Sequence, residues 1–124
     1  KAARILRAVL HSLRKRLSID ESFHVLAQLP MMLKGIYIDG WNPQLPFQRI
    51  KHLHEFLDEV RQQDGGQAAY DFGNDEKASE LVGIVFRVLQ DHISEGEMSD
   101  ILDNLPVALK HFILSEGTEQ KLVM

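Results

Sequence analysis

The chain has 124 residues, of which 44% are apolar and 26% are charged, and it contains no cysteine. This length fits a single domain, and the composition is that of a folded globular chain, which excludes disordered and collagen-like classes. The missing cysteines exclude disulfide scaffolds, thiolate metal sites and cysteine nucleophiles, and they favour a reducing, cytoplasmic compartment. The net charge of −4 argues against nucleic acid as a partner, and the longest unbroken apolar stretch is too short for a membrane span.

Three helices are predicted in the first third of the chain. Apolar residues recur at three- and four-residue steps over residues 2–16, which predicts a first amphipathic helix. Ser18 and Glu21 have the spacing of a capping box, so a second helix begins there and runs to Leu29. Pro30 suits the first turn of a third helix, which reaches about Ile38.

A turn, one helix and a linker are predicted next. Gly40 ends the third helix and Pro43 belongs to the turn that follows. Apolar spacing predicts a connecting helix over about 47–62. Residues 63–75 are rich in glycine and lack an apolar period, so we expect a flexible linker.

The last third of the chain repeats the first at a constant offset of 76 residues. Residues 5–39 align without a gap on residues 81–115, and the matches include polar residues and proline that amphipathic periodicity does not explain. The identical pairs include Val9 and Val85, Ser18 and Ser94, Glu21 and Glu97, Leu29 and Leu105, Pro30 and Pro106, and Lys34 and Lys110. Residues 76–91, although rich in β-branched residues, are therefore predicted to be helical like their counterpart.

These elements predict an all-α fold of about seven helices. Two pseudo-symmetric helical repeats, unit one at about 5–39 and unit two at about 81–115, pack into one bundle. The whole chain, residues 1–124, is expected to form one domain.

The sequence resembles the bacterial family called domain of unknown function 2267. Three stretches carry the resemblance: residues 6–13, residues 27–41, and residues 86–97 followed by the Leu105-Pro106 pair. The resemblance implies an all-helical domain with tandem halves. It implies no activity, because the family carries no established catalytic or binding residues that can be transferred to this chain.

A basic face on the first helix is the leading candidate for a partner-binding surface. The first half of the chain, residues 1–62, holds ten Lys and Arg against six Asp and Glu, whereas the second half holds four against twelve. Four residues share one helical stripe, and Trp41 follows nearby as a candidate aromatic anchor. The candidate partner-binding residues are Arg4, Arg7, His11, Arg14 and Trp41. We hypothesise a non-catalytic interaction or regulatory module with a protein partner; a solvated helix face and a Trp41 that folds back onto the bundle are the alternatives.

No catalytic, metal or cofactor site is predicted. His52 and His54 lie two residues apart, about 200 degrees round a helix, so they would not face one ion. The carboxylates are predicted to lie on polar, solvated helix faces, whereas general acid and base catalysis needs two carboxyl groups held across a cleft. The chain is therefore predicted not to be an enzyme.

The alternative function belongs to another class. A helical bundle can hold a small molecule between facing helices. In this alternative the cavity lies between the two units and is lined by Leu53, Leu57, Ile84 and Phe86.

Overall fold

The computed structural model describes the backbone of residues 1–123 and the side chains of residues 1–115. Every regular element in this part of the chain is a helix and none is a strand, which confirms the all-α prediction. In chain order the elements are α1 (Ala2–Arg14), α2 (Ile19–Gln28), α3 (Met31–Ile38), α4 (Leu53–Asp64), the 3-10 helix η1 (Gly65–Gln67), α5 (Ala68–Phe72), α6 (Asp75–Gln90), α7 (Glu95–Leu102) and α8 (Val107–Val123). Met124, the last residue of the predicted domain, lies outside the described residues.

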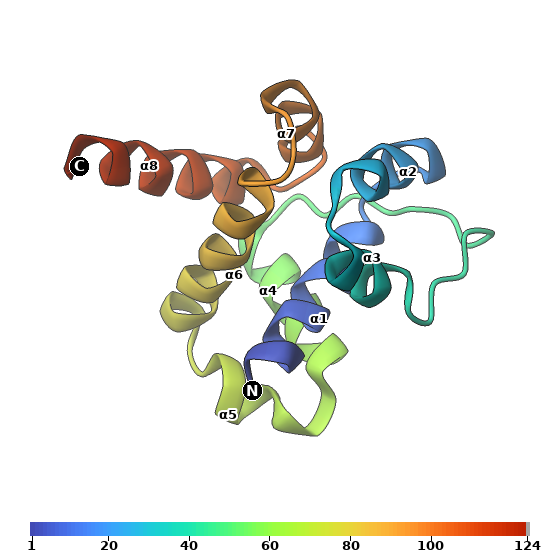
Figure 1. Ribbon diagram of the computed structural model, residues 1–124. Coiled ribbons are helices and arrows are strands. Elements are labelled where there is room, and N and C mark those ends of the chain that lie inside the picture. The colour runs from blue at the N-terminus through green and yellow to red at the C-terminus, as the bar shows by residue number, and fades with distance from the viewer. Residues whose placement is uncertain (124) are drawn as a thin grey trace.

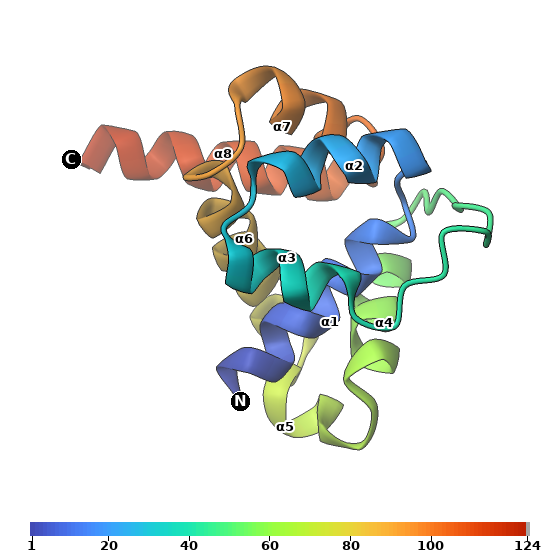
Figure 2. The same ribbon diagram turned by 45° about the vertical axis from the view of Figure 1, so that its right-hand side comes forward.

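Helix α1 lies at the centre of the fold. It contacts α3, α4, α5 and α6, and its longest contact is with α4 (Figure 1). Helices α2 and α7 lie side by side at one end of the molecule, and α5 lies at the other end (Figure 2). In both views the C-terminal part of α8 extends away from the other helices.

The core is built from the apolar stripes that the sequence periodicity predicts. The side chains of Val9, Leu10 and Leu13 on α1 are fully buried. They belong to one cluster with residues from every α-helix, including Phe56 on α4 and Phe86 on α6. Burying side chains of this size stabilises a fold by about 1.5–3 kcal/mol each, which makes α1 the element around which the others pack.

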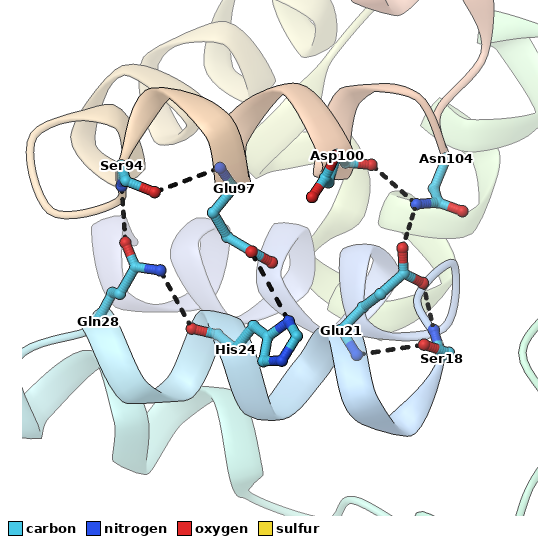
Figure 3. Close-up of polar contacts among 8 residues, drawn as sticks. All are labelled: Ser18, Glu21, His24, Gln28, Ser94, Glu97, Asp100 and Asn104. Atoms are coloured by element: carbon cyan, nitrogen blue, oxygen red, sulfur yellow. Dashed lines mark hydrogen bonds and ion pairs between the residues drawn. The ribbon is translucent and has the colours of Figure 1, made fainter.

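The two predicted units meet through α2 and α7, which run antiparallel (Figure 3). Ser18 Oγ accepts from the Glu21 amide, and Glu21 Oε1 accepts from the Ser18 amide at 2.9 Å, so the predicted capping box is present. At α7, Ser94 Oγ accepts from the Glu97 amide. The second half of that cap comes from α2, because the Ser94 amide donates to Gln28 Oε1 at 2.7 Å.

A second side-chain amide, that of Asn104, connects the end of α7 to the start of α2. Asn104 Nδ2 donates to Glu21 Oε2 at 2.8 Å and to the Asp100 carbonyl at 2.9 Å (Figure 3). An amide at the end of each helix therefore reaches the capped N-terminus of the other helix. The two contacts fix the antiparallel register of α2 and α7, and each satisfies groups that a helix end leaves without an intrahelical partner.

The connecting helix is shorter than predicted. Helix α4 begins at Leu53, and residues 47–52 are irregular, although the sequence predicts a helix from about 47. The Gln48 amide donates to the Lys15 carbonyl at 2.9 Å, which holds this segment against the end of α1. His52, with an extended backbone, is the N-cap of α4. A long-range backbone hydrogen bond here overrides the local apolar spacing.

The predicted flexible linker, residues 63–75, contains regular structure. Helix α4 extends to Asp64, and η1 and α5 follow, so most of the segment predicted to be a flexible linker is helical. Phe72 and Asp71, the last two residues of α5, have no exposed surface. Gly65 and Gly73 adopt positive φ values of 68 and 62 degrees and end α4 and α5. The glycines are helix stops between short helices.

The helix starts in the last third follow the predicted offset of 76 residues. Helices α2 and α7 begin at Ile19 and Glu95, and helices α3 and α8 begin at Met31 and Val107. Residues 75–90 are helical as predicted, despite their β-branched composition. Helix α8 continues past its predicted end near residue 113. Pseudo-symmetry between the two units stays a prediction.

Candidate functional site

Two of the predicted face residues hold the C-terminal end of α3. Arg14 donates to the carbonyls of Tyr37 and Asp39 at 2.7 Å each. His11 Nε2 lies 2.8 Å from the Ile36 carbonyl. The last carbonyls of a helix have no intrahelical partner and carry partial negative charge, so a cationic or N–H donor from α1 stabilises them.

His11 is a neutral donor in this arrangement. Its side chain is buried with 5% of its surface exposed. Burial lowers its pKa, the bond to the Ile36 carbonyl acts in the opposite direction, and nearby Arg14 and Arg7 lower the pKa further. Because a carbonyl oxygen only accepts, Nε2 must carry the proton. His11 therefore acts as a structural link between α1 and α3.

Arg7 and Asp39 form an ion pair at the edge of the same contact. Both side chains are about half exposed, at 49% and 54%. The Arg7 hydrogen bond and charge hold the pKa of Asp39 below its ordinary value, so the pair is charged at neutral pH. A solvated pair of this kind adds little stability, and both groups remain accessible.

Arg4 pairs with a carboxylate that the sequence analysis did not select. Its Nε and NH2 atoms donate to the two oxygens of Asp71 at 2.8 and 2.9 Å. Arg4 is 42% exposed while the Asp71 side chain is fully buried. The guanidinium holds the pKa of Asp71 at about 2. This two-bond geometry is the strong form of such pairs and anchors α5 to the start of α1.

Asp64 completes this cluster. Its Oδ2 atom is buried and has no hydrogen-bond partner among the described side chains. Burial and the neighbouring Asp71 carboxyl raise the pKa of Asp64 to about 6. Below about pH 6, a protonated Asp64 can therefore donate a hydrogen bond to the ionised Asp71 carboxylate.

Trp41 packs against the bundle. Its ring makes edge contacts with Phe23 and Tyr37, at centroid distances of 5.9 and 6.1 Å. The Tyr37 hydroxyl lies 2.7 Å from Ser22 Oγ inside the core, and burial raises the pKa of Tyr37 to about 12. Trp41 therefore folds back over the α2–α3 contact, and only part of its surface is open to solvent.

The predicted face is thus not a continuous free surface. Arg7, His11 and Arg14 come together at the end of α3, while Arg4 lies at α5 and Trp41 lies beyond α3. The helical spacing of the charges gave no signal that their acceptors lie within the same chain. Whether a partner also uses this stripe stays a prediction.

The two histidines at the start of α4 are placed differently from the sequence-based prediction. His52 is the extended N-cap and lies outside the helix, so the helical angle of 200 degrees does not apply. The rings of His52 and His54 stack with centroids 5.6 Å apart. No group of three or more potential metal ligands occurs among the described residues.

The described pockets lie elsewhere than the predicted cavity. Phe86 and Leu57 are buried in the core, whereas Ile84 is 48% exposed. A pocket of about 470 Å³ instead lies among the end of α6, α7 and α8. Its lining includes Ile93, Met98, Leu102 and Ile113, with Glu95 and Lys110 among its polar residues.

The helices and the contacts of α1 define an all-α domain. Among the described residues, no helix is both long enough and apolar enough to span a membrane. The family model of the uncharacterized conserved proteins called DUF2267 matches residues 1–112. The chain belongs to this family, which confirms the resemblance. A search of curated proteins finds no match.

Proposed function

We propose that the chain is a non-catalytic helical module that binds a protein partner through α3. One observation carries the proposal: Met31 and Met32 are 81% and 72% exposed, and Ile38 at the other end of the helix is 47% exposed. Large apolar side chains gathered on one exposed helix are typical of interaction surfaces.

The groove beside these residues supports the proposal. Met31, Met32 and Ile38 line a shallow depression together with Arg7 and Asp39. Methionine side chains adapt to the shape of an apolar partner. Arg7 and Asp39 supply a polar rim, which is how protein interfaces are usually built.

Helix α3 is also held in place by hydrogen bonds from α1 and α2. His11 and Arg14 bind its C-terminal carbonyls, and Tyr37 is fixed by its hydrogen bond to Ser22. A preorganised surface loses little conformational entropy on binding. In this proposal the predicted basic face has two roles, because His11 and Arg14 position α3 while Arg7 borders the partner.

Site-specific crosslinking tests the proposal. A photoreactive amino acid replaces Met32, and in a matched chain it replaces Glu80, an exposed residue of α6. In cells that express the chain, we expect one defined crosslinked protein from position 32 and none from position 80. A charge at the neighbouring position, Met31→Asp, should abolish that product while circular dichroism stays unchanged.

Two results would contradict it. Equal products from positions 32 and 80 would mean that the crosslinks are non-specific. A product that survives Met31→Asp would mean that apolar contacts on α3 do not hold the partner.

The second candidate is a small-molecule site, favoured by the pocket of about 470 Å³ among α6, α7 and α8. Its volume and its mix of apolar and polar lining are typical of ligand sites. A ligand that binds only the folded chain raises its melting temperature. In a screen of small molecules, hits at this site should lose their effect in Met98→Gln, and a screen without hits counts against the candidate.

A further inference from the structure

A basic side chain just beyond α1 is buried without a hydrogen-bond partner. Arg16 is 3% exposed, and its Nε atom is buried and contacts no acceptor among the described side chains and backbone. A guanidinium carries five N–H donors and stays protonated. Burying such a group without a hydrogen-bond acceptor is costly, and within the chain the Glu59 carboxylate only partly offsets that cost by its charge, so an acceptor that reached Arg16 through a neighbouring recess would be stabilising.

Arg16 lines a recess of about 300 Å³. The recess lies between the end of α1, the segment 45–50 and α4, and its other lining residues are Lys15, Leu45, Pro46, Gln48, Ile50 and Glu59. The backbone bond from Gln48 to Lys15 keeps the segment in place beside it. The recess is therefore formed by ordered parts of the fold.

The charges of the recess leave it positive. Glu59 Oε1 accepts from Lys15 Nζ at 2.9 Å and from Gln63 Nε2 at 3.1 Å. Burial raises the pKa of Glu59, but these two donors outweigh it, and the pKa lies below its ordinary value. Glu59 is thus charged and already engaged. With Lys15 and Arg16 opposite a single carboxylate, one positive charge remains uncompensated.

We propose that this recess binds a small carboxylate with a short apolar chain. The planar fork of Arg16 matches the two oxygens of a carboxylate, and Lys15 stands beside it. Leu45, Pro46 and Ile50 provide an apolar wall for the chain of the ligand. A monoanion matches the single uncompensated charge, whereas a doubly charged phosphate would meet repulsion from Glu59.

Titration with sodium butyrate, followed by NMR of the arginine Nε–H signals in the full chain, tests the proposal. Sodium chloride at equal ionic strength is the reference. We expect the Arg16 signal to shift with a saturable curve and half-saturation at about 1 mM, a reasonable affinity for a ligand of this size. Sodium phosphate in a parallel titration should produce a weaker shift.

Variants distinguish specific binding in the recess from a general effect of charge. Lys15→Gln should weaken butyrate binding about tenfold, whereas Lys51→Gln, an exposed lysine of the neighbouring segment, should leave it unchanged. Glu59→Gln removes the opposing carboxylate and should strengthen binding. Arg16→Lys keeps the charge without the fork and should weaken binding; if that variant does not fold, the Lys15 and Glu59 variants still decide.

Three outcomes would overturn the proposal. A linear, non-saturating shift of the Arg16 signal would mean that no site exists. Tighter binding of phosphate than of butyrate would mean that the ligand class is wrong. Weaker binding in Glu59→Gln, together with a shifted Arg16 signal before any ligand is added, would mean that Glu59 is the partner of Arg16 in solution.

Discussion

Replacing Phe72 with alanine tests whether α5 belongs to the core. The sequence places Phe72 in a flexible linker and Phe47 in a helix, whereas the structure buries Phe72 completely and leaves Phe47 46% exposed in an irregular segment. The same substitution at the two positions therefore separates the two descriptions. Phe72→Ala should be the costly change, with Phe47→Ala as its matched control.

The expected magnitude follows from burial. A fully buried phenylalanine loses about 3–5 kcal/mol of stability when it is cut to alanine, because transfer and cavity terms add. At Phe47, where nearly half of the surface is already exposed, the loss should be about 1 kcal/mol or less. A domain of this kind has a total stability of about 5–15 kcal/mol, so Phe72→Ala should remove about a fifth of it or more.

Urea unfolding measures both losses. Trp41 is the single tryptophan and packs against Tyr37 and Phe23, so its fluorescence reports on the folded bundle. With a urea slope of about 1.5 kcal/mol per molar, the midpoint of Phe72→Ala should fall by about 2 M or more. Equal midpoints for Phe72→Ala and Phe47→Ala would refute the placement of α5 in the core.

Three further predictions concern buried polar groups. Tyr37→Phe and Ser22→Ala should each cost about 1–2 kcal/mol in urea unfolding, because each leaves one partner of a 2.7 Å buried bond unsatisfied, and the double variant should cost less than the sum. Because burial lowers the pKa of His11, the unfolded chain gains the proton first as the pH falls below about 6.5, so His11 lowers stability from pH 7 to pH 5; in an Asp64→Asn background, where the opposing contribution of Asp64 is absent, the urea midpoint should fall over this range, and less when His11→Gln is added. Because the pKa of Asp64 is raised from 3.8 to about 6, protonated Asp64 stabilises the folded chain, and this stabilisation is lost as the pH rises through 6. Carbon NMR of the Asp64 carboxyl should show a titration midpoint near pH 6, and Asp64→Asn should remove this part of the pH dependence of the urea midpoint.

The parts of the fold predicted from sequence are those fixed by local signals. Ser18 is the N-cap of α2, as the capping box requires, and Pro30 is the N-cap of α3, one position before the first turn in which the sequence predicts it. Residues 47–52 and 63–72 were missed because distant contacts decide them. The Gln48 to Lys15 backbone bond and the Arg4 to Asp71 pair each join residues more than 30 positions apart.

The candidate site was predictable only in part, and the reason lies in α1. A charge stripe at three- and four-residue spacing defines a helix face, but the same stripe serves a partner molecule or a neighbouring helix of the same chain. The acceptors of His11 and Arg14 are backbone carbonyls at the end of α3, which are present whatever residue types occupy that turn, so no sequence pattern reveals them. Arg16 is the opposite case. It sits in the same basic stretch and no pattern separates it from Lys15, yet burial leaves it without an acceptor. The informative residue for function is therefore the one whose charge the fold does not satisfy, and the titration of its Nε–H signal addresses it directly.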